Sequence, residues 1–192
     1  DAEQSDKLEM CVRDTAPTEI YNLAGPSSVA ESFSNSSKTI NSAVNITVNC
    51  LETIRNICPE TRYYNAASSE CFGDTGNSLA SETTPFQPVS PYGISKLCAE
   101  NYLRFFNDQY GLSTTVLRYS NVFGPHQNPH GEAGVIAIFC QKLVKSQKPV
   151  ICGDGEQTRD FISVRDVMQA NLIALDPKCI GTFNVGTGKE TS

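Results

Sequence analysis

Blocks of hydrophobic and polar positions along this chain predict alternating strands and helices. Residues 18–25 (TEIYNLAG) form a short apolar run that ends in glycine, which is typical of a buried strand. Residues 38–58 repeat apolar positions every three or four residues and stop before Pro59, which predicts an amphipathic helix. Residues 61–69 (TRYYNAASS) and 113–120 (STTVLRYS) predict two further strands.

The stretch SPYGISKLCAENYLRFFNDQYG, residues 90–111, predicts a second long helix with defined ends. Ser90 can cap its first turn, Pro91 suits the first helical position, and Gly111 can end it. The order strand, helix, strand, helix, strand implies crossover connections and a mostly parallel sheet with helices on both faces. Ligands of such α/β sheets bind beyond the carboxyl ends of the strands.

After Gly124 the chain becomes more polar, and its elements become shorter. We expect a polar loop over residues 125–134 and an amphipathic helix over residues 135–147. Two short strands around a glycine-rich turn are expected over residues 149–164, and a last helix over residues 165–175. Residues 1–124 are therefore expected to form the main domain. Residues 125–192 are expected to form a smaller lobe that exchanges elements with the main sheet.

Composition narrows the class of protein. The 192 residues are 39% apolar, which is enough for the core of one domain. A net charge of −6 and the absence of a basic cluster argue against nucleic-acid binding or anionic-membrane binding as the main activity. Eight cysteines are scattered singly, which favours buried free thiols over a disulfide framework or a zinc site. With no membrane-length apolar run and no signal peptide, a cytoplasmic location is expected.

Tyr92 and Lys96 are four residues apart at the start of the second long helix, so they share one helix face. A phenol with a pKa of about 10 is a poor base, but a neighbouring ammonium stabilises the phenolate. Lowering that pKa to about 7 takes roughly 4 kcal/mol. Such a pair can remove the proton of a hydroxyl while a hydride leaves the same carbon. A half-buried tyrosine beside a solvated lysine is the other interpretation of so short a pattern.

Six segments together resemble a known family. They are, in chain order, NLAG, AASSECFGD, PVSPYGISK, LRYSNVFGP, GDGEQTRDF and FNVGTG. Their order and approximate spacing resemble the extended short-chain dehydrogenase/reductase family and, within it, the nucleotide-sugar epimerases and 4,6-dehydratases. The resemblance covers almost the whole chain. It implies an α/β fold with a Rossmann-like doubly wound parallel sheet, here missing its first strands, and a smaller C-terminal substrate lobe.

The resemblance also implies roles for individual residues. Tyr92 would be the general base, Lys96 would lower its pKa, and Ser68 would bond the reacting sugar hydroxyl. The residues expected at the cofactor are Leu23, Ala24, Gly25, Tyr92, Lys96 and Tyr119. The residues expected at the substrate are Ser27, Ser69, Asn121 and Arg159, the last of which suits a diphosphate. A strand-end cap at Ser68 and an ion pair between Arg159 and Asp160 are the structural alternatives.

Glu70 bears on the reaction, because dehydratases and related decarboxylases of this family carry glutamate two positions after the Ser or Thr. Once C4 is a ketone, a carboxyl group can take the acidic C5 proton and help to expel the C6 hydroxyl. Residues 65–75 resemble GDP-mannose 4,6-dehydratases, whereas residues 121–139 and 153–161 resemble UDP-glucose 4-epimerases. We therefore expect a 4,6-dehydratase of a GDP-mannose-like nucleotide sugar, with UDP-glucose 4-epimerase as the alternative. A capping carboxylate is the other interpretation of Glu70.

The family implies NAD as the cofactor, with NADP possible, and no metal. It holds the dinucleotide on a GxxGxxG turn, which does not occur in these residues, so the first strand and its turn are expected upstream of Asp1. These residues alone are then expected to bind NAD poorly. An inactive family scaffold is the alternative from another class, against which the intact Tyr92, Lys96 and Ser68 argue. Related dimers imply a homodimer in which the two long helices form a four-helix bundle.

Overall fold

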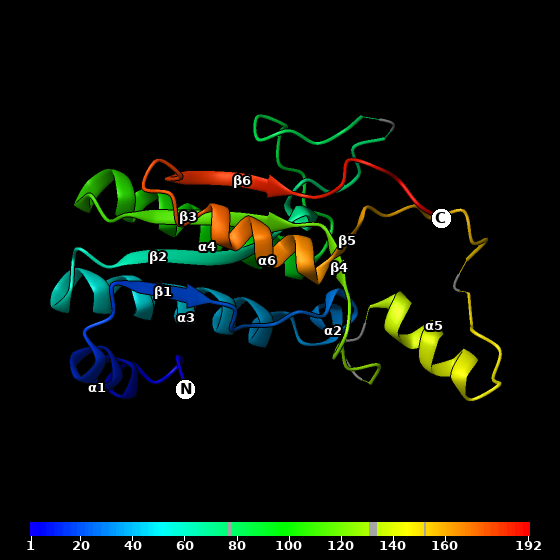
Figure 1. Cartoon of the computed structure of the whole chain (residues 1–192), viewed down its shortest axis with the longest axis horizontal. Coiled ribbons are helices and arrows are strands. Elements are labelled where there is room, and N and C mark those ends of the chain that lie inside the picture. The colour runs from blue at the N-terminus through cyan, green and yellow to red at the C-terminus, as the bar shows by residue number, and fades with distance from the viewer. Residues whose placement is uncertain (77, 131–133, 152) are drawn as a thin grey trace.

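The computed structural model of the chain describes residues 1–76, 78–130, 134–151 and 153–192. It is an α/β fold in which helices and strands alternate along much of the chain (Figure 1). The elements are α1 (Ser5–Thr15), β1 (Glu19–Asn22), α2 (Val29–Ser34), α3 (Ser36–Ile57), β2 (Arg62–Ser68), the 3-10 helix η1 (Ser69–Cys71), α4 (Pro91–Tyr110), β3 (Thr114–Tyr119), β4 (Asn121–Phe123), α5 (Val135–Val144), β5 (Phe161–Ser163), α6 (Val164–Ile173) and β6 (Gly181–Val185).

Four strands form a Rossmann-like parallel sheet in the order β1-β2-β3-β6. Its register sets Asn22 beside Asn65 and Ser68 beside Tyr119. Because all four strands run the same way, their carboxyl ends meet at one edge of the sheet. Two short strands, β4 and β5, form a separate parallel pair. The parallel α/β sheet expected from the sequence is thus confirmed, and β6 brings a C-terminal segment into it.

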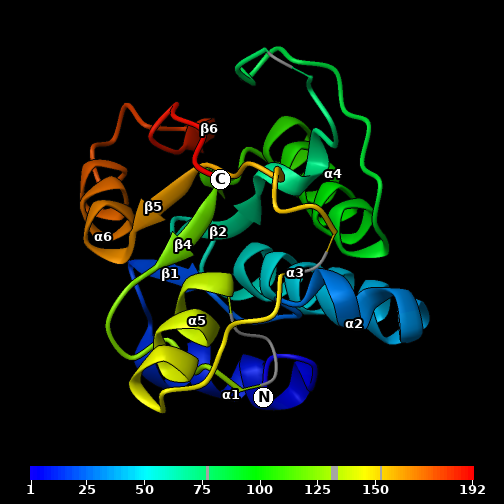
Figure 2. The same ribbon diagram turned by 90° about the vertical axis from the view of Figure 1, so that its right-hand side faces the viewer.

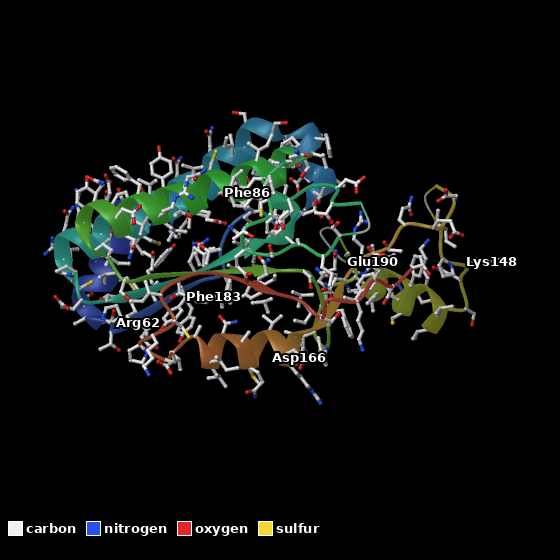
Figure 3. All side chains as sticks on the ribbon, turned by 90° about the horizontal axis from the view of Figure 1, so that it is seen from above. Arg62, Phe86, Lys148, Asp166, Phe183 and Glu190 are labelled. Carbon is white, nitrogen blue, oxygen red and sulfur yellow. The ribbon has the colours of Figure 1, made fainter. Side chains whose placement is uncertain are left out.

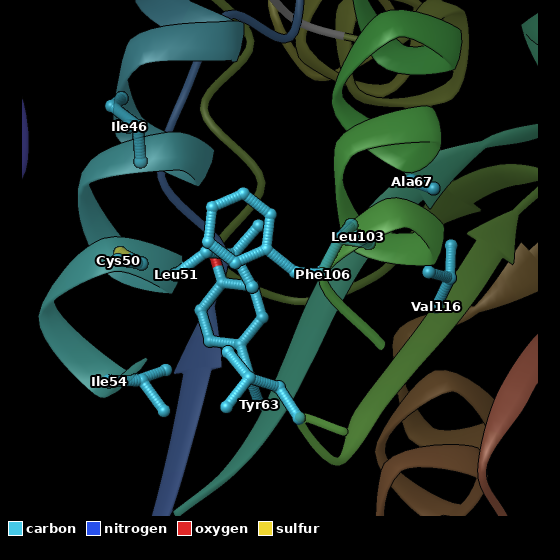
Figure 4. Close-up of a cluster of buried hydrophobic side chains, with 10 residues drawn as sticks. Ile46, Cys50, Leu51, Ile54, Tyr63, Ala67, Leu103, Phe106 and Val116 are labelled. Carbon is cyan, nitrogen blue, oxygen red and sulfur yellow. The ribbon is translucent and has the colours of Figure 1, made fainter. Parts of the chain in front are cut away.

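Helices cover both faces of the sheet. The helices α3 and α4 lie on one face and α6 lies on the other (Figure 3). The main hydrophobic core fills the space between α3, α4 and the sheet (Figure 4), and consists of Ile46, Cys50, Leu51, Ile54, Tyr63, Ala67, Leu103, Phe106, Leu112 and Val116. Each fully buried leucine or isoleucine there contributes about 1.5–3 kcal/mol. On the other face, Tyr64 and Leu117 pack with Ala174 at the end of α6.

The helix α4 begins and ends where the sequence predicts. The Ser90 hydroxyl accepts the backbone N–H of Gly93 at 3.0 Å, and Pro91 is the first helical residue. Gly111 ends the helix in the left-handed conformation, with φ +70°. A serine cap is worth about 1 kcal/mol, and it fixes the first turn, which carries Tyr92. The sequence therefore specifies both the helix and the position of Tyr92 in its first turn.

In the C-terminal half, one expected strand does not form in the described residues, and one expected helix is shorter than expected. No strand forms over residues 149–151, where Pro149 offers no N–H and the side chains of Val150 and Ile151 are exposed, so in the described part of that segment only β5 is a strand. The helix expected over residues 135–147 is confirmed as α5, but it ends at Val144, because Ser146 has φ +54°, outside the helical region.

The seven described cysteines are all free thiols. Cys50 and Cys71 are buried, whereas Cys11 of α1 and Cys140 of α5 are exposed, so burial is confirmed for only part of the set. Across the described ranges, the helices are too short or too polar to cross a bilayer. Two expectations fall partly outside the described residues, namely those for Cys152 and for residues 131–133 of the polar loop.

Candidate active site

The carboxyl ends of β1, β2 and β3 open into a cavity of about 740 Å³. Figure 2 looks toward this edge of the sheet, with β4, β5 and α5 on the viewer's side. The residues that the sequence singles out and that line this cavity are Leu23, Gly25, Ser27, Ser68, Ser69, Glu70, Tyr92, Lys96, Tyr119 and Asn121. Segments as distant as β1 and β4 thus meet at the edge where a parallel sheet is expected to bind its ligand.

Tyr92 and Lys96 lie in the first turns of α4. The ammonium nitrogen of Lys96 lies 5.6 Å from the centre of the Tyr92 ring and donates to the carbonyl oxygen of Ala66 at 3.4 Å. Ala66 belongs to β2, so this bond ties the helix to the sheet at the cavity wall. Burial lowers the pKa of Lys96 to about 8, because desolvation disfavours its charged form. The structure thus keeps an unusually acidic ammonium against the phenol ring.

Ser68 is the last residue of β2 and is 9% exposed. Its hydroxyl oxygen accepts the backbone N–H of Glu70 at 3.3 Å and so caps η1. The capping alternative for Ser68 is therefore present, but it uses only acceptor capacity, and the hydroxyl hydrogen can still be donated to a ligand. Glu70 approaches α4 closely, since a Cβ on Gly93 would lie 2.6 Å from the Glu70 carbonyl oxygen. Glycine at this position permits η1 and the Tyr92 turn to touch.

The turn after β1 is held by a buried amide pair. The Asn22 side chain donates to the Asn65 side chain at 3.0 Å and accepts the backbone N–H of Ala24 at 3.1 Å. This arrangement directs Leu23 and Gly25 to the cavity, whereas Ala24 is not among its described lining residues. Gly25 has φ +125°, a conformation that favours glycine. The turn after β1 therefore contributes two of its three expected cofactor residues to the lining.

Tyr119 lines the cavity, but its phenol is bonded to α6. The Tyr119 hydroxyl donates to the side-chain oxygen Oδ1 of Asn171 at 3.1 Å and accepts from the side-chain nitrogen Nδ2 of Asn171 at 2.9 Å. Burial raises the pKa of Tyr119. Asn121 follows at the start of β4, where its backbone N–H donates to the carbonyl oxygen of Asp160 at 2.9 Å. Tyr119 can thus offer a ligand mainly its ring, while the exposed Asn121 side chain offers its amide.

Arg159 is not among the described residues that line the cavity. Its guanidinium donates to the carbonyl oxygen of Thr158 at 2.8 Å, and its backbone bridges to Thr191. The Asp160 carboxylate accepts instead from the backbone N–H groups of residues 187–188, at 2.8 and 2.9 Å. The geometry therefore supports neither the diphosphate contact nor the ion pair with Asp160.

Sequence reasoning missed part of the lining. Phe123 and Phe161 reach the cavity from β4 and β5, which become neighbours only when these strands pair. Ser120 also lines the cavity, and its hydroxyl oxygen is buried with no hydrogen-bond partner among the described residues. Ser120 could have been predicted from the sequence, because it lies between Tyr119 and Asn121, which are both expected at the site. Its unmet hydrogen-bonding capacity suits a polar ligand.

The assembled groups suit proton transfer at a hydroxyl group. A phenol beside an ammonium can act as a base, and a serine hydroxyl can orient the oxygen that loses its proton. The carboxyl group of Glu70 adds a second candidate proton acceptor at the same edge.

The sequence profile of the NAD dependent epimerase/dehydratase family matches residues 1–186. A Methanocaldococcus jannaschii protein whose name as a UDP-glucose 4-epimerase is provisional shares 46% identity over 146 residues, which is 76% of this chain and 48% of that protein. The dTDP-D-glucose 4,6-dehydratase of Homo sapiens shares 35% identity over 132 residues, 68% of this chain and 37% of that protein. The chain thus spans half or less of the length of these relatives.

Two solved structures have the same fold over nearly the whole chain. The UDP-glucose 4-epimerase of Thermotoga maritima with UDP-glucose superposes with a TM-score of 0.94 at 35% identity, covering 99% of this chain and 62% of the other. The UDP-glucose 4-epimerase of Thermus thermophilus in complex with NAD gives 0.92 at 34% identity, covering 100% and 63%. Fold, motifs and profile therefore agree, and this chain belongs to the NAD-dependent epimerase/dehydratase family.

Proposed function

We propose that the protein containing this chain oxidises the hexose of a nucleotide sugar at C4, using NAD, and yields the C4 epimer. The observation that carries the proposal is the cavity that brings together the Tyr92 phenol, the Lys96 ammonium and the Ser68 hydroxyl. Two comparisons support the substrate class, since the Thermotoga structure is described with UDP-glucose and the Methanocaldococcus relative has a UDP-glucose 4-epimerase name.

The described residues fit the nicotinamide end of NAD. A Cβ on Gly25 would lie 3.9 Å from the Lys96 nitrogen, so the bare glycine leaves room beside the ammonium for a ligand. Leu23 is 71% exposed at the same edge and offers an apolar surface to a flat ring. Leu23 and Gly25 would hold that end, and Lys96 would donate to it. Bound NAD would supply a hydride acceptor and, once reduced, a hydride donor.

The chain's own residues would move the proton. Tyr92 would take the proton of the C4 hydroxyl as the C4–H bond breaks, leaving a ketone at C4. Lys96 would stabilise the phenolate that begins the cycle, and Ser68 would donate to the C4 oxygen. After the sugar presents its other face, Tyr92 would return the proton to the C4 oxygen. The proton and the hydride both end on the substrate, so the net change is inversion at C4.

Dehydration is the second candidate, and Glu70 is the observation that favours it. Glu70 lines the cavity two residues after Ser68, so a carboxyl group is available to take a C5 proton from a 4-keto sugar. The human dTDP-D-glucose 4,6-dehydratase relative supports this candidate as well. We place epimerisation first because the higher of the two identities is to the relative with the epimerase name.

Product analysis tests the proposal. The natural protein that contains these residues is incubated with NAD and, separately, with UDP-glucose, dTDP-glucose and GDP-mannose, and the sugars are identified by proton NMR. Formation of UDP-galactose from UDP-glucose is expected. A 4-keto-6-deoxy sugar from any substrate would establish the dehydratase instead. If none of the three nucleotide sugars is converted, both candidates are contradicted.

Two further assignments belong to this proposal. A homodimer through α3 and α4 is supported by the exposed apolar side chains of Ile94, Tyr102 and Phe105 along α4. Sedimentation of the purified protein tests it, with a monomer at all concentrations as the contrary result.

A cytoplasmic location is supported by the free state of the seven described cysteines, and fluorescence imaging of a tagged protein tests it.

A further inference from the structure

Arg118 of β3 and Glu100 of α4 form a buried ion pair between the helix and the sheet. Only 3% of Arg118 and 6% of Glu100 is exposed. The Nε of Arg118 donates to Oε2 of Glu100 at 2.9 Å, and the Nη2 of Arg118 donates to Oε1. Within the described ranges, the second ion pair is on the surface of α1, so this one is distinguished by its burial.

Two aromatic rings contact the same guanidinium. Its central carbon lies 5.1 Å from the centre of the Phe72 ring and 4.8 Å from that of Phe86. Phe72 follows η1 directly, and Phe86 belongs to the long connection to α4, on the α4 side of the sheet (Figure 3). A guanidinium over ring faces gains a cation–π attraction, which is stronger when water is excluded. Arg118 therefore joins β3, α4 and the segment that follows η1.

Stability alone does not account for this arrangement. A buried ion pair loses hydration free energy that its attraction often only balances, and apolar side chains of similar volume are commonly as stable. A bidentate pair adds geometry, because the planar fork of arginine and the two carboxylate oxygens meet in one orientation. The pair can therefore serve a function that depends on the orientation of the elements it joins.

The pair stands close in the chain to each candidate catalytic group. Glu100 lies four residues after Lys96 and eight after Tyr92, so all three share one side of α4. Arg118 directly precedes Tyr119, whose partner across the ladder is Ser68. The pair thus links the helix that carries the phenol to the strand next to the serine.

We propose that Arg118 is a positioning residue that sets the distance between the Tyr92 phenol and the Ser68 hydroxyl, acting through Glu100 and Phe72. The inference rests on the proposed function, in which both groups act on one sugar oxygen. Proton transfer requires about 2.6–3.2 Å between heavy atoms, and a displacement of about 1 Å can cost roughly 100-fold in rate. Arg118 does not line the cavity among the described residues, so its effect is indirect.

The test compares Arg118→Lys with Arg62→Lys in the natural protein that contains this chain. Both arginines make several buried or half-buried hydrogen bonds, but Arg62 starts β2, at the opposite end of the strands from the cavity. Steady-state kinetics are measured at a temperature where circular dichroism shows both variants folded. For Arg118→Lys we expect kcat to fall about 10-fold or more with KM changed less than about 3-fold, because only the geometry of the reacting groups is altered. For Arg62→Lys we expect both constants unchanged.

A second measurement does not depend on turnover. Fluorotyrosine is placed at residue 92, and its fluorine resonance is compared among the wild type, Arg118→Lys and Arg62→Lys. We expect the resonance to shift only in Arg118→Lys. An unshifted resonance, or equal changes in both variants, would overturn the positioning role. If the wild type converts no nucleotide sugar while the resonance still shifts selectively, the proposed function is wrong and the positioning of Tyr92 by Arg118 stands.

Discussion

The ammonium of Lys96 lies 5.6 Å from the centre of the Tyr92 ring. Burial lowers the pKa of this lysine to about 8, and desolvation is the cause. A negative charge on the Tyr92 oxygen would compensate that desolvation, so the burial that destabilises the ammonium favours the phenolate beside it. Ionisation of the phenol would therefore offset part of the free energy that burying the ammonium costs.

Lys96→Met should stabilise the chain at neutral pH. The pKa of Lys96 is about 8 in the folded chain and about 10.4 when unfolded, so between these values the unfolded state binds more protons and wild-type stability rises with pH. Below about pH 8 the full cost of the buried charge applies, up to about 3 kcal/mol. The advantage of Lys96→Met should therefore be largest at pH 7 and shrink toward pH 10. Urea unfolding over this range measures it, with the exposed Lys38→Met as control, and a pH-independent difference would contradict the expectation.

Tyr92→Phe should abolish the proton transfer while leaving the fold intact. We expect kcat to fall by about 100- to 10,000-fold, the usual contribution of a general base, with little change in KM. The matched control is Tyr102→Phe, which removes a hydroxyl from the same helix at a side chain that is 43% exposed. Steady-state kinetics with UDP-glucose measure both. Equal rates for Tyr92→Phe and wild type would remove Tyr92 from the mechanism.

Glu70→Gln separates the two candidate reactions. Epimerisation needs no proton transfer at C5, so we expect its rate to change by less than about 3-fold, whereas dehydration should fall about 100-fold. Glu52→Gln, on the exposed side of α3, controls for the loss of one charge. Proton NMR of the products follows both reactions in one sample. Loss of epimerisation in Glu70→Gln alone would assign this carboxyl group a part in the first candidate.

Arg62→Met should destabilise the fold by releasing the end of α6. The Arg62 guanidinium donates to the carbonyl oxygens of Ala174, Leu175 and Asp176, at 3.1, 2.6 and 3.1 Å. These are carbonyl groups at a helix C-terminus, where a cation is favourable, and we expect a loss of about 2 kcal/mol. Arg165→Met removes a cation from the first turn of the same helix and should change the unfolding free energy by less than about 0.5 kcal/mol. Urea unfolding compares them, and equal effects would refute the capping role.

Gly73→Ala should be far more costly than Gly76→Ala. Both glycines have positive φ, +67° and +58°, so each substitution by alanine lowers the unfolding free energy by about 1 kcal/mol through backbone strain. A Cβ on Gly73 would also lie 2.0 Å from the carbonyl oxygen of Gln87, whereas a Cβ on Gly76 would meet nothing within 4 Å. We expect a total of about 3 kcal/mol for Gly73→Ala, because the clash adds to the strain. Thermal unfolding of both variants measures the difference, and similar melting temperatures would show that the loop relaxes.

The sequence predicts best the elements whose ends and burial are encoded locally. The helix α4 has a serine cap, a proline at its first position and a terminal glycine, and the structure places all three as expected. In contrast, α1 has Val12 as its one buried residue, too weak a pattern to single out. The strand β6 is only half-buried and gains its place by pairing with β3, which local periodicity does not reveal. Tertiary contacts therefore decide these elements.

The same distinction applies to the site. Tyr92 and Lys96 are four residues apart, so helical geometry alone sets them on one face. Phe161 reaches the cavity because β5 pairs with β4, and no local signal encodes that pairing. The ion pair of Arg118 and Glu100 could have been suspected, because a charged residue inside the buried strand TTVLRY requires a partner. The identity of that partner depends on how α4 packs on the sheet.

The lining of the cavity runs from Leu23 to Phe161, and this spread has a consequence for synthesis in the cell. A nascent chain emerges from the ribosome at about 5–20 residues per second. Several seconds therefore pass between the synthesis of Leu23 and that of Phe161, the last residue of the described lining. During that interval nothing that binds the finished cavity can hold the chain together. A ligand of this cavity can therefore stabilise only molecules whose translation has passed Phe161.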